Sequence, residues 1–281
     1  MRELRIVLTP FCNYKCFFCH GESSEKRIAL QLTPSDYEFL GQAAKDKLGW
    51  NTATITGGEP LVSPIFGDVC EKLHQLGLDL TVVTNASLLA RPAEMLKNVG
   101  QINVSLHTMN PCTYEQITQT GYPLERVLDT IVTTRALLPD LRIHLNYTVI
   151  KGMNDTDADF EEFLAFAKEV GAVAKFIDLS TIDDSLRTSA DGILCQLYRL
   201  GFTIKDESAW QTRVTRGNQL VAVTRCPFNG RYDNLPARDV FVDPNGVLYK
   251  SYGGLLQIDA LNDIKSRNAD RLVKKINFLV G

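Results

Sequence analysis

Leu4-Arg5-Ile6-Val7-Leu8-Thr9-Pro10-Phe11-Cys12-Asn13-Tyr14-Lys15-Cys16-Phe17-Phe18-Cys19 is the stretch that decides the fold of this chain. Its apolar start, residues 4–8, is typical of a short buried strand. The loop that follows carries three cysteines in the order C-x-x-x-C-x-x-C. Three thiolates at this spacing can converge on one metal centre, and three Cys leave one iron of a cubane iron–sulfur cluster without a protein ligand. That iron is a place for a cofactor or substrate to bind.

A structural zinc site is the alternative for the same loop. Cys12, Cys16, Cys19 and His20 supply three sulfurs and one imidazole, which zinc also accepts. Zinc ligands usually come from two separated pairs that pin two turns together, whereas these four residues lie in one loop. The spacing therefore favours an iron–sulfur cluster.

Composition limits the class of protein. The 281 residues are 44% hydrophobic and carry a net charge of -3, which is enough apolar material for one large core and gives no basic footprint for nucleic acid. No apolar run approaches the ~18 residues of a membrane span, and the N-terminus lacks a secretory segment. We expect a cytoplasmic protein that binds neither nucleic acid nor membranes.

The other four cysteines, Cys70, Cys112, Cys195 and Cys226, are scattered singly. In a reducing compartment this argues against a disulfide framework. Cys70 falls in an apolar helical segment, residues 65–76, so we expect it to be a small core residue.

Up to residue 180 the chain repeats one theme, a short β-branched run followed by an amphipathic helix. Strands are predicted at residues 4–8, 52–55, 80–83, 102–106, 142–150 and 174–179, and helices at 34–48, 65–76, 92–98, 124–138 and 157–170. Such alternation requires parallel strands covered by helices. Six steps are too few for a closed eight-unit barrel, so the predicted fold is α/β, a partial (βα)6 TIM-like barrel over residues 1–180.

The alternation breaks after residue 180. The sequence predicts a helix near 191–200, a hairpin whose turn is Asp243-Pro244-Asn245-Gly246, and a tail helix at 269–278. We interpret residues 181–281 as a C-terminal extension that completes the open side of the barrel and covers the substrate site as a lid.

Unusual polar residues recur where predicted strands end. They are Cys12, Gly57 to Glu59, Thr84, Asn85, Ser105, His107, Lys151, Gly152 and Asp178. Because parallel α/β sheets place ligands at the carboxyl ends of their strands, these residues predict one shared site.

The cysteine loop, with Phe18 directly before the third Cys, and the Gly57-Gly58-Glu59-Pro60 turn about forty residues later resemble the radical SAM superfamily. The resemblance implies a [4Fe–4S] cluster on Cys12, Cys16 and Cys19, with S-adenosylmethionine (SAM) on the fourth iron through its amino and carboxylate groups. It also implies cofactor contacts from Phe18 to the adenine, from Gly57, Gly58 and Glu59 to the methionine amino group, and from Thr84, Asn85, Ser105 and Asp178. Ser, Thr and Asn are also common loop caps, which is the alternative for those residues.

Within the superfamily the chain is most similar to the MoaA-like branch. The matching segments are residues 16–22, residues 146–155 and the run Phe176-Ile177-Asp178-Leu179. That branch carries a second cluster on three C-terminal Cys, whereas this chain offers Cys226 alone and has Ser251 where the last ligand is expected. Thr54 stands where a triphosphate-binding arginine is expected, and Lys175 is followed by no second cation. We therefore reject molybdenum cofactor synthesis and expect a differently charged substrate.

Candidate substrate contacts are Arg5, which matches the resembled family, His107, Lys151, Arg231 and Arg238. Both later arginines belong to a polar segment, 225–243, that is either a solvated loop or part of the lid, where they would face a carboxylate or phosphate. If Cys226 or Cys195 reaches the substrate, its weak S–H bond could return a hydrogen atom to a substrate radical, which would make the reaction a redox-neutral epimerisation.

The sequence thus predicts an enzyme with a single [4Fe–4S] cluster that cleaves SAM to a 5′-deoxyadenosyl radical and abstracts hydrogen from a small molecule of nucleoside, sugar or amino-acid type. An electron donor such as flavodoxin or ferredoxin would supply the electron. Three alternatives stay open: modification of a ribosomal peptide, a nucleotide dehydratase of the viperin type, and a structural zinc or iron–sulfur module. The peptide alternative is less favoured because no recognition domain precedes the first predicted strand.

Overall fold

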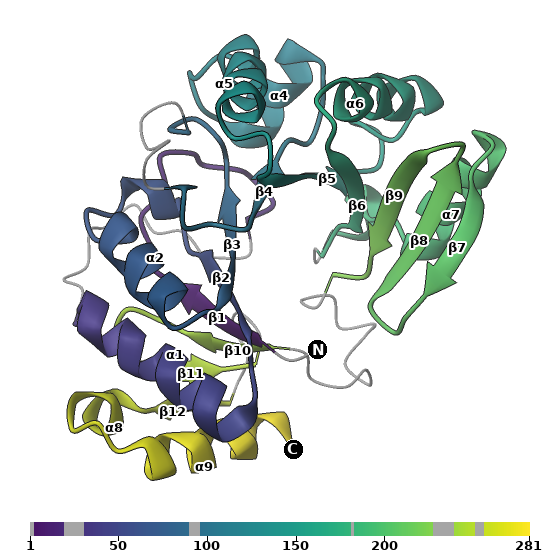
Figure 1. Ribbon diagram of the computed structural model, residues 1–281. Helices are drawn as coiled ribbons and strands as arrows, with labels where there is room; N and C mark the ends of the chain where they lie inside the picture. The colour runs from purple at the N-terminus through teal and green to yellow at the C-terminus, as the bar shows by residue number, and fades with distance from the viewer. Residues whose placement is uncertain (1–2, 20–30, 90–95, 181–182, 227–238, 251–255) are drawn as a thin grey trace.

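A computed structural model describes residues 3–19, 31–89, 96–180, 183–226, 239–250 and 256–281. Their strands form one curved sheet in the order β12-β11-β10-β1-β2-β3-β4-β5-β6-β9-β8-β7. Figure 1 shows this sheet curling into an open half-barrel, with helices on its outer face. The predicted α/β partial barrel is confirmed.

Six parallel strands make the centre of the sheet. They are β1 (Glu3–Val7), β2 (Thr52–Thr56), β3 (Asp79–Thr84), β4 (Gln101–Ser105), β5 (Arg142–Val149) and β6 (Val173–Asp178). Between them run α1 (Pro34–Leu48), η1 (Pro60–Val62), α2 (Phe66–Gln75), α4 (Pro111–Thr118), α5 (Leu124–Leu137) and α6 (Asp157–Glu169). The sequence predicted the strands and most of these helices to within one or two residues. It missed α4, and residues 92–95 of the helix predicted at 92–98 lie outside the described residues.

Local signals in the sequence explain where the helices begin and end. Thr33 and Asp36 form a capping box at the start of α1, and Thr156 and Asp159 form a second one at the start of α6. Helix α1 ends at Gly49, whose φ of 69° lies in the left-handed region that glycine adopts without cost. These caps fix the helices on the outer face, so that the loops at the other ends of the strands can build a site.

The main core lies between the sheet and the outer helices. Tyr147 on β5 and Phe176 on β6 are fully buried and pack against Phe160 and Phe163 of α6, with ring centroids 4.3 to 5.9 Å apart. Cys70 is fully buried in α2, as its apolar setting predicted.

The segment after residue 180 extends the sheet at both edges. Strand β9 (Gln219–Thr224) pairs in parallel with β6, and β10 (Asp239–Val242) pairs in parallel with β1. The remaining elements are η2 (Asp184–Leu186), α7 (Ala190–Arg199), β7 (Thr203–Glu207), β8 (Gln211–Arg216), β11 (Val247–Tyr249), β12 (Gln257–Asp259), α8 (Leu261–Lys265) and α9 (Ala269–Val280). The structure confirms α7, the β10–β11 hairpin and α9; the antiparallel strands β7 to β9, together with β12 and α8, were not predicted.

Buried charges tie the C-terminal helices to the barrel. The Asp36 carboxylate of α1 accepts hydrogen bonds from Lys265 at 2.6 Å and Arg267 at 2.7 Å. Burial opposes the charge of Asp36, but these partners and the Thr33 cap hold its pKa well below the usual range. Within the described part of the chain, no helix is long and apolar enough to cross a membrane.

Candidate functional site

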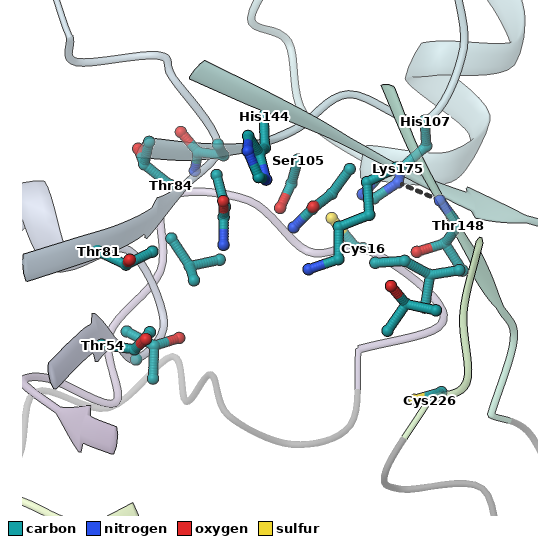
Figure 2. A pocket seen from close by; sticks show the side chains of 18 of the residues that line it. Cys16, Thr54, Thr81, Thr84, Ser105, His107, His144, Thr148, Lys175 and Cys226 are labelled. Atoms are coloured by element: carbon teal, nitrogen blue, oxygen red, sulfur yellow. Dashed lines mark hydrogen bonds between the residues drawn. The ribbon is translucent and has the colours of Figure 1, made fainter. Parts of the chain in front are cut away.

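A cavity of about 450 Å³ lies inside the half-barrel. It is lined by the cysteine loop, by residues from each of β1 to β6, and by Gln211, Thr224 and Cys226 from the C-terminal segment. Figure 2 shows side chains from several strands converging on this space, with Cys16 and Cys226 on different sides of it. Of the strand-end residues singled out by the sequence, seven line this cavity: Cys12, Gly57, Gly58, Thr84, Asn85, Ser105 and His107.

Cys12, Cys16 and Cys19 all line this cavity. The Cys12 sulfur accepts a hydrogen bond from the Tyr14 backbone N–H at 3.4 Å, and the Cys19 N–H donates to the Cys16 carbonyl at 3.0 Å, which folds the loop around the three thiols. Burial raises the pKa of Cys12 to about 11 and of Cys16 to about 12, so a cluster must displace their protons when it binds.

The donor set fits an iron–sulfur cluster. Thiolates are the usual protein ligands of such clusters, and three of them around a cavity leave room for the cluster and a further ligand. Among the residues that the structure describes, no three His, Cys, Asp or Glu side chains are grouped to hold a single metal ion. His20, the fourth residue of the zinc alternative, lies outside the described residues.

The glycine turn after β2 packs directly against the cysteine loop. Gly58 N–H donates to the Thr9 carbonyl at 2.7 Å, and Glu59 N–H donates to the Phe11 carbonyl at 2.9 Å. A Cβ on Gly58 would lie 2.2 Å from the Phe11 oxygen, and a Cβ on Gly57, whose φ is 143°, would lie 2.4 Å from the Thr9 oxygen. Only glycine permits this approach, which brings the backbone of Gly57 and Gly58 to the cavity wall.

Glu59 points into the protein. It is fully buried, is absent from the cavity lining, and accepts hydrogen bonds from the Thr84 hydroxyl, the Asn85 N–H and the Leu61 N–H at 2.7 to 3.1 Å. Burial raises its pKa to about 7 against the effect of these three donors. In the structure its carboxylate clamps the glycine turn to the end of β3, and the contact of Glu59 with an ammonium group stays a prediction.

Asn85 extends this clamp to the cluster loop. Its Nδ2 donates to Asn13 Oδ1 at 2.9 Å and approaches the Cys12 sulfur at 3.9 Å, while its Oδ1 accepts from the N–H and hydroxyl of Ser87. Asn13 in turn donates to the Ser87 hydroxyl at 2.9 Å. Thr84 and Asn85 also line the cavity, so they both shape it and hold the cysteine loop.

His107 and Phe18 form one side of the cavity, next to Ser105. The two rings meet edge to face, with centroids 4.9 Å apart. Nδ1 of His107 accepts the Thr148 N–H at 3.1 Å, and burial lowers the pKa of the imidazole to about 4. His107 is therefore neutral near pH 7 and carries its proton on Nε2.

Polar side chains cover the strands below the loops. The strand wall, as we call it, consists of Thr54, Thr81, Gln101, Asn103, His144, Asn146 and Lys175, all of which line the cavity. In the sheet register Thr54 faces Thr81, Asn103 faces His144, and Asn146 faces Lys175. Burial lowers the pKa of His144 to about 4, with Lys175 and Arg142 adding to the effect.

Arg5 lies at the β1 edge of the strand wall and is held by acidic groups. Its Nη1 is 3.2 Å from an Asp239 oxygen and 3.9 Å from a Glu3 oxygen, and its guanidinium lies over the Phe241 ring. Arg5 lines the cavity as predicted, but the ion pairs reduce the charge it can offer to a ligand.

The other predicted site residues differ in where they lie. Cys226 is buried and lines the cavity, while the Asp178 carboxylate lies behind it and accepts the Cys226 N–H at 2.6 Å. Lys151 is exposed in the turn after β5 and is not part of the cavity lining. Arg231, Arg238 and Ser251 lie outside the described residues.

The comparisons with known proteins agree with this geometry. The family model described as the radical SAM superfamily matches residues 6–167, which is more than half of the chain. The chain belongs to the radical SAM superfamily. Its members are enzymes that use a [4Fe–4S] cluster and SAM, so the predicted enzyme class and both cofactors are confirmed.

Two relatives carry the same name in different archaea. The probable GTP 3′,8-cyclase of Thermococcus kodakarensis is 35% identical over 66% of this chain and 60% of its own length. The probable GTP 3′,8-cyclase of Methanocaldococcus jannaschii is 31% identical over 66% of this chain and 62% of its own length. The resemblance to the MoaA-like branch is thus confirmed, although less than two thirds of these relatives' length is matched.

Among solved structures, SuiB of Streptococcus suis bound to S-adenosylmethionine aligns with a TM-score of 0.71. The alignment covers 96% of this chain and 65% of SuiB at 16% identity. At that identity the likeness establishes the fold alone. It extends past residue 180, so the similarity in fold includes strands that the sequence pattern did not reveal.

Proposed function

We propose that this protein is a radical SAM enzyme with a single cluster that acts on a small molecule bound in the half-barrel. The observation that carries the proposal is the convergence of three thiols, the glycine turn and a polar strand wall on one cavity of about 450 Å³. A cavity of this size takes a drug-sized molecule. Residues 181–281 contain two cysteines, Cys195 and Cys226, which are too few thiols to hold a second cubane cluster.

In this proposal each wall of the cavity has a separate task. Cys12, Cys16 and Cys19 hold the cluster, and the backbone of Gly57 and Gly58 at the cavity wall holds the amino group of SAM. Phe18 and Ser105, which both line the cavity, would contact the adenosine. When bound, the cluster would supply the electron for reductive cleavage of SAM, which would provide the hydrogen-abstracting radical.

The protein itself positions SAM and the substrate and excludes water from the cavity. The Glu59 clamp fixes the glycine turn relative to the cysteine loop through Thr84 and Asn85. Neutral His107 offers its Nε2–H to a ligand without adding charge. We propose that a flavodoxin or ferredoxin delivers the electron; the predicted lid contacts Arg231 and Arg238 lie outside the described residues.

The experiment is anaerobic reconstitution of the cluster followed by reduction with dithionite in the presence of SAM. We expect 5′-deoxyadenosine and methionine as products, with a rate that rises when a substrate is added. A reconstituted protein that binds its cluster but yields no 5′-deoxyadenosine with any candidate substrate would contradict the proposal.

GTP is the substrate named for the relatives, and the described cavity does not favour it. Thr54 occupies the strand position where we expected a triphosphate-binding arginine, and Arg5 is already paired with Asp239. Because a triphosphate needs several cationic partners, we propose a substrate with less negative charge than GTP.

The position of Cys226 favours one reaction type, a redox-neutral epimerisation. Its thiol lines the cavity on the C-terminal side, and its backbone is anchored to buried Asp178. Breaking the S–H bond would form a C–H bond on the substrate radical and leave a thiyl radical. One electron from the flavodoxin or ferredoxin and one proton from water would then restore the thiol.

Replacing Cys226 with Ala tests this step. Epimerisation predicts that the variant still forms 5′-deoxyadenosine but loses deuterium incorporation from D2O into the product. Unchanged turnover and unchanged product would remove Cys226 from the mechanism, and the exposed Cys195→Ala serves as the matched control.

A further inference from the structure

The inside of this half-barrel is polar where a TIM-type barrel is filled with branched aliphatic side chains. Three neighbouring strand pairs place hydrogen-bonding residues opposite one another: Thr54 and Thr81, Asn103 and His144, and Asn146 and Lys175. Most of these groups can both donate and accept hydrogen bonds. A wall of this composition is suited to a ligand that presents several hydrogen-bonding groups of its own.

Charge is scarce on the described lining of the cavity. Apart from the cysteines and neutral histidines, it carries the cations Arg5 and Lys175 and the anion Glu3. Arg5 is held by Asp239 at 3.2 Å. The described lining therefore provides little compensation for a polyanion and matches a ligand that is uncharged or carries one negative group.

Asn146 gives the most specific indication of a ligand contact. It is 8% exposed, lines the cavity, and its Oδ1 has no hydrogen-bond partner. A buried carbonyl oxygen without a donor is unfavourable, so in native proteins such an oxygen usually bonds to water or to a ligand. Because Asn146 lines the cavity, a ligand bound there can supply that donor.

Large aromatic side chains are confined to one side. In the described part of the lining they are Tyr14 and Phe18, both from the cysteine loop, and the only ring among the strand-wall residues named above is the imidazole of His144. Flat rings such as nucleobases are commonly held by aromatic stacking. The strand wall instead matches a saturated ring that is recognised through its hydroxyl groups.

We propose that the strand wall binds the hydroxyl-bearing ring of a carbohydrate, with one ring hydroxyl donating to Asn146 Oδ1 and at most one anionic substituent near Lys175. The ring can belong to a free sugar, to a sugar monophosphate or to the ribose of a nucleoside. This inference rests on the proposed function, because it names the substrate class of the same cavity.

Anaerobic isothermal titration calorimetry of the reconstituted holoprotein saturated with SAM tests the inference. The probes are glucose, glucosamine, glucose 1-phosphate, adenosine, guanosine and GTP. We expect at least one carbohydrate or nucleoside probe to bind more tightly than GTP, and the ranking of the probes distinguishes the three sources of the ring. Tighter binding of GTP than of every other probe, or binding of none, would overturn the inference.

Two variants link binding to the named oxygen. Asn146→Leu keeps the shape but removes the acceptor, so we expect about tenfold weaker binding of the best probe. Asn146→Asp keeps an acceptor oxygen and should retain most of the affinity. Equal binding by the wild type and Asn146→Leu would overturn the role of Asn146, and Thr54→Val provides a second test of the wall if the Leu variant does not fold.

The outcome for the proposed function is measured separately in wild-type protein. Formation of 5′-deoxyadenosine together with a preference for GTP would refute the carbohydrate assignment and leave the radical enzyme intact. If the reconstituted protein binds a carbohydrate but does not cleave SAM, the proposed radical function is refuted and the carbohydrate assignment stands.

Discussion

The two sides of the cavity satisfy their polar groups in different ways. The loop wall is formed by the cysteine loop, the glycine turn and the end of β3. Its polar side chains form hydrogen bonds to one another or to the backbone; they are Asn13, Glu59, Asn85 and Ser87. On the strand wall, Asn146 Oδ1 has no protein partner. The difference indicates that the cofactor side is organised before any ligand binds, whereas the substrate side is completed by its ligand.

Removing a cluster thiol is expected to have the largest effect on the loop wall. Cys16→Ala leaves two of the three proposed ligands, so the cluster should not assemble and 5′-deoxyadenosine should fall to background. Iron and sulfide content after reconstitution, with the visible absorbance of the cluster, measure the loss. Cys112→Ala, at an exposed cysteine, is the control and should reconstitute normally; full iron content in Cys16→Ala would refute the ligand assignment.

Crowding the glycine turn tests whether the loop wall is preorganised. Gly58→Ala places a methyl group 2.2 Å from the Phe11 carbonyl oxygen and 2.7 Å from the Cys12 nitrogen, so the cysteine loop must move. We expect a loss of about 1–3 kcal/mol in the free energy of unfolding and weaker SAM binding.

Gly121→Ala is the matched control for that substitution, because nothing lies within 4 Å of its added methyl group. Its free energy of unfolding should stay within about 0.5 kcal/mol of the wild type. Equal stability and equal SAM affinity in both variants would show that the close approach at Gly58 has no consequence.

Removing the buried carboxylate separates clamping from direct cofactor binding. Glu59→Leu leaves the Thr84 hydroxyl and the Asn85 and Leu61 N–H groups without their acceptor. The apoprotein should lose about 3 kcal/mol in urea unfolding, since each orphaned donor costs roughly 1–3 kcal/mol. If the apoprotein keeps its stability and only SAM binding weakens, Glu59 acts on the cofactor and the clamp is wrong.

The smallest effect is a pH dependence from the strand wall. Burial lowers the pKa of His144 to about 4, so the unfolded chain takes up a proton near pH 6.5 that the folded protein does not. The contribution of neutral His144 to the free energy of unfolding is fully present above pH 6.5 and is lost as the pH falls toward 4. His144→Gln should therefore flatten the decline in unfolding free energy over this range, whereas the exposed His74→Gln should not; parallel pH curves would contradict the assignment.

The sequence could predict the loop wall because its signals are local. Cys12, Cys16 and Cys19 lie in one loop, Gly57 and Gly58 form one turn, and Thr33 and Gly49 mark the ends of one helix. The direction of the Glu59 side chain could not be predicted, because its donors Thr84 and Asn85 come from the next strand.

The strand wall was harder to predict because it depends on which strands are neighbours. Asn103, His144 and Asn146 appear in the sequence as ordinary polar positions of strands, and only the sheet register places them around one cavity. Lys175 was noted in the sequence without being assigned to the site. One signal in the sequence was available: Asn146 is a polar position between the buried apolar residues Leu145 and Tyr147, so it lies on the opposite face of the strand from them.

The C-terminal strands escaped prediction for a related reason. Strand β7 is mostly exposed and polar, so it lacks the apolar alternation that marks a half-buried strand, and β8 is held mainly by pairing with its neighbours. Lys151 and Asp178 were both chosen because they follow or end a strand, yet one points to solvent and the other lies behind Cys226.

The central claim is that one cluster with an open iron binds SAM on the loop wall. Electron paramagnetic resonance of the reconstituted, dithionite-reduced protein, recorded with and without SAM and combined with iron analysis, tests it most directly. We expect about four iron atoms per chain and a spectrum whose g-values shift when SAM is added. A spectrum indifferent to SAM, or about eight iron atoms per chain, would contradict it.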